Sequence, residues 1–111
     1  MSGPQHTPGP LGLVQSLGSS NNGTFHLYLV DASERKIAAL WGQADEKMAN
    51  GYLFQAAPDL LSLCRKAAGQ FRFYERQHRA KGTPEADAKA EVNAALAAEI
   101  EAVIAVAEGR E

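Results

Sequence analysis

The segment Gly82-Thr83-Pro84-Glu85 (GTPE) decides how the second half of this chain folds. Glycine is favoured just after the last turn of a helix, where the backbone takes a left-handed conformation. Threonine is a good N-cap, and proline is well tolerated at the first helical position after it. We therefore predict that one helix closes at Gly82 and another opens at Thr83. A connection this short makes the two helices antiparallel.

Residues recur at helical spacing on both sides of this junction. Residues 58–81 carry Leu60, Leu63 with Cys64, Ala67, Phe71, Tyr74 and His78. Residues 84–108 carry Ala90, Asn93, Leu96 with Ala97, Ile100, Val103 with Ile104, and Ala107. The two stripes predict that residues 58–81 and 84–108 form a long helical hairpin.

Pro58 predicts the start of the first of these helices. Proline disfavours helical dihedral angles at the residue before it, and it fits the first turn of a helix. Residues 45–57 are therefore expected to form a separate short helix. Its residues at helical spacing are Met48, Tyr52 or Leu53, and Ala56.

The N-terminal part of the chain predicts a small sheet. Residues 24–30 (TFHLYLV) are rich in β-branched, aromatic and apolar side chains, and residues 36–41 return as a second strand after the loop 31–35. A third strand is expected around Leu11, Leu13 and Gln15, before the turn-forming residues 16–23, which include Asn22-Gly23. Prolines make residues 1–10 an extended, flexible arm.

The predicted fold class is thus α+β. It comprises an antiparallel β-meander of two or three strands over residues 11–41, the short helix, and the helical hairpin. The 111 residues suffice for a single domain over residues 1–111. Alanine supplies much of the 45% apolar content and aromatic residues are only 7%, so the core has few large side chains. We therefore expect a homo-oligomer, with a dimer favoured.

Cysteine content and hydropathy indicate the compartment. Cys64 is the only cysteine, which fits a reducing environment. The first ten residues hold three prolines and no apolar run, so we expect no secretory signal there. No stretch approaches the roughly 20 apolar residues of a membrane-spanning helix. These observations predict a cytoplasmic protein without a membrane partner.

Charge is distributed unevenly, although the net charge is only −2. Residues 58–81 carry +4, and residues 82–111 carry −5. The basic residues of interest lie at steps of 7, 4 and 3 on one side of the first long helix, with Phe73 beside them: Arg65, Arg72, Arg76 and Arg79. Two interpretations stay open. Such a row can bind phosphates or stack on bases, and it can also pair with the acidic helix that follows.

If the row serves a partner, the candidate binding residues are the four arginines, Phe73 and Trp41. An acidic host protein or a small phosphorylated signal would fit. We do not expect nucleic acid, because it normally requires a clear excess of positive charge. Trp41, the only tryptophan, either caps the core under the helices or anchors a partner.

The sequence offers no catalytic, metal or cofactor site. Cys64 and His78 would be the obvious nucleophile and base, but fourteen residues of one helix separate them by roughly 21 Å. The histidines show no metal-ligand spacing, and there is no glycine-rich phosphate loop. We therefore expect a protein that is not an enzyme and has no cofactor.

Three strings of the sequence resemble a group of small bacteriophage and prophage proteins. These strings are HTPGP at residues 6–10, VDASERKIAAL at 30–40 and QAAPDLL at 55–61. Members of that group typically begin HTPGPW and carry NARLIAAAPDLLEAL after a short hairpin. The resemblance covers roughly residues 5–65. Leu11 replaces the usual tryptophan, Glu34 replaces the usual glycine of the hairpin loop, and residues 50–55 differ from NARLIA.

The resemblance implies a viral accessory setting in the cytoplasm of an infected bacterium. Together with the absence of catalytic residues, it favours a binding protein that counteracts a host system such as antiviral immunity. That protein would block a protein or sequester a small phosphorylated signal. Two alternatives stay open, namely a nucleic-acid-associated regulator that uses helix 58–81, and a structural or assembly protein.

Overall fold

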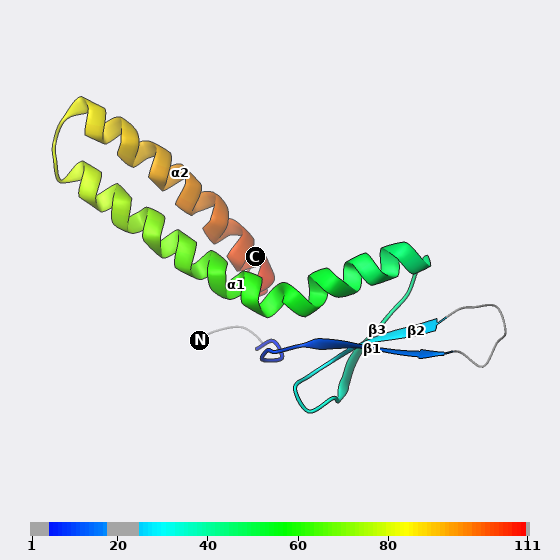
Figure 1. Cartoon of the computed structure of the whole chain (residues 1–111). Coiled ribbons are helices and arrows are strands. Elements are labelled where there is room, and N and C mark those ends of the chain that lie inside the picture. Colours follow the sequence, from blue (N-terminus) through cyan, green and yellow to red (C-terminus); the bar gives the residue numbers. More distant parts are fainter. Residues whose placement is uncertain (1–4, 18–24, 111) are drawn as a thin grey trace. The chain divides into compact units, whose positions relative to one another are not determined.

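The computed structural model describes residues 5–17 and 25–110. Its elements are, in chain order, β1 (Gly12–Leu17), β2 (Phe25–Val30), β3 (Lys36–Leu40), α1 (Ala44–Arg79) and α2 (Pro84–Ala107) (Figure 1). The expected α+β class is confirmed, with an antiparallel sheet followed by a helical hairpin. Helix and strand ends lie within one or two residues of the expected ones for β3, the end of α1 and α2.

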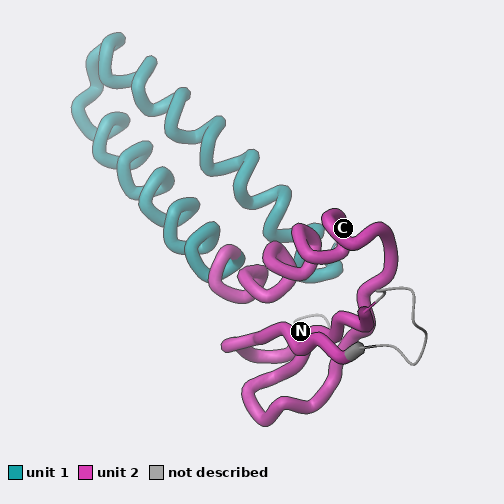
Figure 2. The backbone as a smooth tube through the Cα atoms, turned by 45° about the vertical axis from the view of Figure 1, so that its right-hand side comes forward, with its two compact units in different colours: residues 1–6, 61–111 teal, residues 7–60 magenta. Residues whose placement is uncertain are grey.

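The chain divides into two compact units (Figure 2). The sheet unit comprises residues 7–60, and so it contains the three strands and the first part of α1. The hairpin unit comprises the described part of residues 1–6 and 61–111, and so it contains the second part of α1 and all of α2. The single-domain organisation stays a prediction.

The three strands form an antiparallel meander in the order β1-β2-β3. Leu13 of β1 lies opposite Leu29 of β2, and Leu27 of β2 lies opposite Leu40 of β3. The third strand is therefore present. Ser16 and Leu17 belong to β1 and not to the expected turn, because β2 is long enough to pair with them. Thr24 and the Asn22-Gly23 turn lie outside the described residues.

Asp31 holds the loop between β2 and β3. Its Oδ1 accepts hydrogen bonds from the backbone N–H groups of Ser33 and Arg35, both at 2.9 Å. These bonds, that from Arg35 first, lower the pKa of the Asp31 carboxyl. Glu34 has a φ of 64°, a left-handed conformation that favours glycine. Glu34 therefore occupies a backbone position at which glycine would be less strained.

One face of the sheet packs against the first part of α1, and a glycine makes the contact possible. Leu27 is only 1% exposed. A Cβ atom on Gly51 would lie 3.0 Å from the side chains of both Leu13 and Leu27. On the same helix, Lys47 Nζ donates a 2.7 Å hydrogen bond to the Phe25 carbonyl oxygen. The helix therefore lies close to the sheet because position 51 has no side chain.

Pro58 lies inside α1, so the prediction of two helices over 45–57 and 58–81 is wrong. A proline within a helix removes one backbone hydrogen bond and crowds the preceding turn, at a cost of about 3 kcal/mol. The residues around Pro58 are mainly alanine and leucine, which favour helix. In addition, the two parts of α1 are each stabilised by packing, on the sheet and on α2 respectively. These contributions offset the cost of the proline.

The N-terminal arm packs on α1 at Pro58. A Cβ atom on Gly9 would lie 3.4 Å from Pro58 Cβ, so the backbone of the arm touches the proline ring. The HTPGP and QAAPDLL strings of the sequence therefore meet at these two residues. This contact gives the arm a structural role at Gly9, and the flexibility expected for residues 1–10 stays a prediction.

The hairpin unit is a pair of antiparallel helices with a heptad-like contact (Figure 1). Buried and half-buried positions recur in steps of three and four residues, as in a coiled coil. They are 61, 64, 68, 71, 75 and 78 on α1, and 86, 90, 93, 97, 100 and 104 on α2; positions 67, 72, 94 and 105 beside them are half-buried as well. The most buried of them are mainly alanines, namely Ala68, Ala86, Ala90 and Ala97. Such small side chains let two helices approach closely.

Cys64, Ala67, Phe71 and His78 of the stripe expected on α1 are half-buried, whereas its other three members are not. Leu60, Leu63 and Tyr74 are exposed, whereas the residues that follow each of them are at least half-buried. On α2, Leu96 and Val103 are likewise exposed and Ala97 and Ile104 are buried. Apolar character alone cannot choose between adjacent rows of an alanine-rich helix, and alanine at the contact permits the closer packing.

The junction between α1 and α2 is as the sequence predicts. Gly82 has a φ of 69°, in the left-handed region. Thr83 has an extended backbone, and its Oγ1 accepts a 3.1 Å hydrogen bond from the backbone N–H of Ala86. Pro84 is the first residue of α2. The connection therefore closes one helix and caps the next.

The glycine contact between α1 and the sheet can be tested with a matched pair of substitutions. Gly51→Val should lower the free energy of unfolding by about 1–3 kcal/mol, because the new side chain overpacks against Leu13 and Leu27. Gly69→Val on the same helix should change it by less than about 0.5 kcal/mol, since nothing lies within 4 Å of a Cβ there. Urea denaturation followed by circular dichroism measures both. Equal losses for the two variants would contradict the contact.

Candidate functional site

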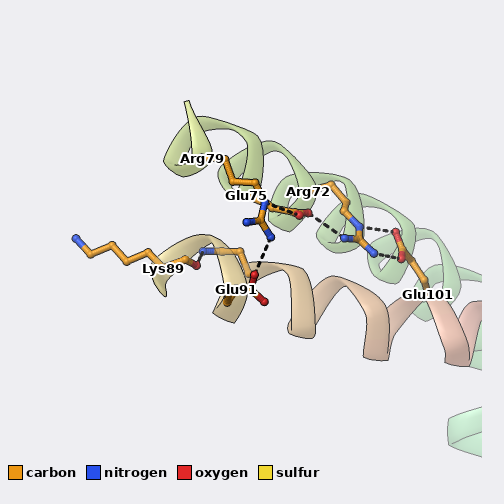
Figure 3. Close-up of polar contacts among 7 residues, drawn as sticks. Arg72, Glu75, Arg79, Lys89, Glu91 and Glu101 are labelled. Atoms are coloured by element: carbon orange, nitrogen blue, oxygen red, sulfur yellow. Dashed lines mark hydrogen bonds and ion pairs between the residues drawn. The ribbon is translucent and has the colours of Figure 1, made fainter. Parts of the chain in front are cut away.

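Arg72 lies at the centre of an ion-paired seam between α1 and α2 (Figure 3). Its Nη2 and Nε donate hydrogen bonds to the two carboxylate oxygens of Glu101, at 2.6 and 3.1 Å. Its Nη1 donates to Glu75 on its own helix at 2.9 Å. The guanidinium group thus uses three of its donors on two carboxylates, and the two-point contact with Glu101 fixes the relative position of the helices.

The seam continues toward both ends of the hairpin. Arg79 donates to Glu75 and to Glu91, in each case at 3.2 Å (Figure 3). Arg65 pairs with Glu108, which also accepts a 2.7 Å hydrogen bond from Arg110 Nε. Since Arg65, Arg72 and Arg79 are seven residues apart, they present one cation per two helical turns to α2.

The seam changes the acidity of its members. Hydrogen bonds from Arg72 hold the pKa values of Glu75 and Glu101 below 4.5, and the bond from Arg65 does the same for Glu108. The carboxylates in turn raise the pKa of Arg72, the contact with Glu101 contributing most. All these groups lie at the surface, so the pairs stay open to screening by salt.

The structure therefore gives three of the four candidate arginines partners within the chain. This agrees with the interpretation that the basic row pairs with the acidic helix. The partners on the acidic side are Glu91, Glu101 and Glu108, and Glu99 takes no part in the ion pairs of residues 5–17 and 25–110. Arg76 is exposed and lacks an ion-pair partner in the same residues.

Phe73 and Tyr74 form an exposed aromatic pair on α1. Their rings meet edge to face with centroids 5.9 Å apart, and Phe73 is 44% exposed. Phe73 lies next to Arg72 in the sequence, but Arg72 is directed to Glu101. Within the described residues, Arg76 is thus the one arginine of the row that remains free to act together with Phe73 on a partner.

Trp41 is 81% exposed, directly after β3. The interpretation that it caps the core is therefore wrong, and the other interpretation, an anchor for a partner, is left. The physical reason is that Leu40 already fills the inward position at the end of β3, opposite Leu27, so the next side chain alternates to the outside.

Three large side chains on the first part of α1 are also exposed, although Tyr52 or Leu53 was expected on the apolar stripe of this helix and none of the three was expected as a binding residue. They are Tyr52, Leu53 and Phe54. Successive residues of a helix are 100° apart, so three consecutive large side chains cannot all face one sheet. With Gly51 on the sheet side, the next three residues point to the flanks and the back of the helix. This run of bulky residues was the signal that could have revealed them.

The other candidate groups do not assemble into a site. Cys64 and His78 both face α2, two heptads apart on the same helix, which is roughly 21 Å. In the part of the chain that the structure describes, no three His, Cys, Asp or Glu side chains gather as metal ligands. None of the helices described here combines the length and the apolar character that crossing a bilayer requires.

Fold and surface together define a small α+β protein with an ion-paired helical hairpin and exposed aromatic side chains. A family model described as Salmonella phage P22 protein Y8K6 matches residues 1–111, so the chain belongs to this family of phage proteins. No curated protein shows significant similarity to the chain, and no solved structure does. The phage setting expected from the sequence is confirmed, and the resemblance to the HTPGPW group in particular stays a prediction.

The two types of arginine can be distinguished by charge reversal. Arg72→Glu should lower the melting temperature by several degrees, because it places a carboxylate between Glu75 and Glu101. Arg76→Glu, four residues away, should leave the melting temperature nearly unchanged. Adding Glu101→Arg to Arg72→Glu should restore part of the loss, since paired sites are not additive. A double variant no more stable than Arg72→Glu alone would argue against the seam.

The seam also predicts a loss of stability in acid. Glu75, Glu101 and Glu108 have folded pKa values below 4.5, so their contribution is complete above that pH and is lost as the pH falls through the lowered values. Thermal unfolding from neutral pH into the acid range should therefore show a steep decline below pH 4.5. Glu101→Gln should show a shallower decline. Parallel curves for the two proteins would disprove the contribution of Glu101.

Proposed function

We propose that this phage protein binds a protein of the infected host and blocks it without catalysing a reaction. The observation that carries the proposal is Trp41, which is 81% exposed. Tryptophan and tyrosine are the residues most often found as energetic anchors of protein interfaces. The phage family supports a target in the infected host, and we propose a component of its antiviral immunity.

Other exposed side chains of the same unit are consistent with a protein partner. The sheet unit also leaves Tyr52, Leu53 and Phe54 exposed on α1. Tyrosine is, like tryptophan, frequent among the anchors of protein interfaces. Aromatic anchors lose little conformational entropy when they become buried, which makes them effective in small interfaces.

A small phosphorylated signal is less well supported. Phosphate recognition relies on arginines with free donors, and Arg65, Arg72 and Arg79 are engaged by carboxylates. The same pairing speaks against helix 58–81 as a nucleic-acid surface, because it neutralises much of the positive charge that phosphate backbones require. The protein-blocking function is therefore the one that the geometry supports best.

The proposal predicts a strong effect of a single aromatic residue. Tagged protein is incubated with lysate of the host bacterium, and captured proteins are identified by mass spectrometry. The captured target should bind Trp41→Ala about thirtyfold more weakly than the wild type, as expected for a loss of at least about 2 kcal/mol at a hot spot. Phe73→Ala, which removes an exposed aromatic ring from the hairpin unit, serves as the matched control.

Each outcome of this experiment has a clear reading. Loss of the target with Trp41→Ala alone supports the proposal. Loss with Phe73→Ala and not with Trp41→Ala moves the binding surface to the hairpin unit. If neither variant affects capture of the target, exposed aromatic residues do not mediate its binding, and the proposal is wrong. Circular dichroism melts of each variant verify that the fold is intact.

A further inference from the structure

The hairpin has two contrasting sides. Positions one residue after the buried ones carry the ion-paired seam, with Arg72 and Glu101 at its centre. Positions one residue before the buried ones lie on the opposite side of the interface. Each residue turns a right-handed helix by 100° in the same sense along its own direction. In an antiparallel pair, the positions that precede the buried ones therefore point to the same side on both helices. The ion pairs therefore lie on one side of the hairpin, and the positions that precede the buried ones lie on the other side.

The side opposite the seam is apolar. On α2 it presents Val92 and Val103, which are 61% and 63% exposed, and Leu96, which is 38% exposed. On α1 it presents Leu63 and Tyr74, which are also exposed. A valine or leucine side chain removes roughly 60–120 Å² of apolar surface on burial, so these five side chains present on the order of 250 Å². Two such surfaces facing one another would bury on the order of 500 Å², which is less than standard specific interfaces bury, so these side chains form only the apolar centre of a weak interface.

The charges along this side are arranged in a self-complementary way. At steps of 3, 4, 3 and 4 residues, one row of α2 reads Lys89, Val92, Leu96, Glu99 and Val103. The part of this row from 89 to 99 is symmetric about position 94. If a second copy of α2 packs antiparallel about a twofold axis at that point, Val92 meets Leu96 of the other copy. Lys89 then meets Glu99 of the other copy, and the twofold axis repeats each contact.

The side chains of this row are available for such a contact. Lys89 and Glu99 are exposed, and neither takes part in an ion pair within residues 5–17 and 25–110. Lys89 extends away from the Arg79–Glu91 pair (Figure 3). The acidic residues further along α2, in contrast, are used in the seam. Lys89 and Glu99 therefore have no ion pair within the described part of the hairpin. These are the two residues that the twofold arrangement pairs with each other.

We propose that two copies of this chain associate through this row of α2, antiparallel, with Val92 and Leu96 at the centre and reciprocal Lys89–Glu99 pairs on either side. The hairpin provides a reason for association. The fully buried positions of its own interface are alanines apart from Ile104 and bury little apolar surface, so a second hairpin on the apolar side adds the layer that a helical bundle needs. The small area predicts weak association that becomes visible only at high protein concentration.

A charge-swap cycle tests the arrangement. Sedimentation equilibrium of the full chain should show a mass of twice 11.9 kDa at high concentration. Lys89→Glu and Glu99→Lys should each raise the dissociation constant about tenfold, because two attractive pairs become two repulsive ones. The double variant with both changes should return close to the wild-type value. Leu96→Glu should be monomeric.

The controls separate this arrangement from general charge effects. Lys66→Glu makes the same change in net charge as Lys89→Glu, at an exposed position on the outer side of α1, and should leave the dissociation constant unchanged. Melting curves of each variant establish folding. A wild-type chain that stays monomeric at high concentration overturns the proposal. Single reversals without effect, or a double variant that fails to recover, also overturn it.

Discussion

The two-point contact of Arg72 with Glu101 fixes how α1 is rotated against α2. A bidentate arginine–carboxylate pair tolerates little change in direction, so it defines the side of each helix that lies beside the partner. Glu75 holds the same guanidinium group from its own helix. The contribution of this exposed seam to stability is modest, but its geometry places alanines at the contact and leaves the larger apolar residues outside it.

Alanine at the contact has consequences for the whole hairpin. Close approach of the helices gives good packing but removes little apolar surface from water. Valine and leucine side chains on α2 consequently face outward, on the side opposite the seam. A chain that keeps such residues at the surface has a favourable free energy to gain from another copy or another protein. The low aromatic content of the sequence pointed to the same need.

The sheet unit solves its packing with glycine and proline. Gly51 brings α1 close to Leu13 and Leu27, and Pro58 receives the N-terminal arm at Gly9. Because small residues make these contacts, several larger side chains of the unit stay exposed to solvent, Trp41 most of all. A phage protein with separate apolar surfaces on its two units can use one for a host partner and one for a second copy, so the two proposals can be tested independently.

The sequence by itself determined the order of elements and the junction at Gly82 and Thr83, because backbone preferences and capping act over a few residues. Its charge pattern offered the acidic helix as one of two interpretations of the arginines in residues 58–81, and the contacts of the structure supplied the partners. Only the tertiary structure decided that α1 continues through Pro58, since packing on both sides of the proline outweighs its local cost. It alone decided which row of each helix is buried, because alanine-rich rows are nearly equivalent in hydrophobicity and differ only in the contacts that they allow. The tertiary structure also decided that Trp41 is exposed, because Leu40 already fills the inward position at the end of β3.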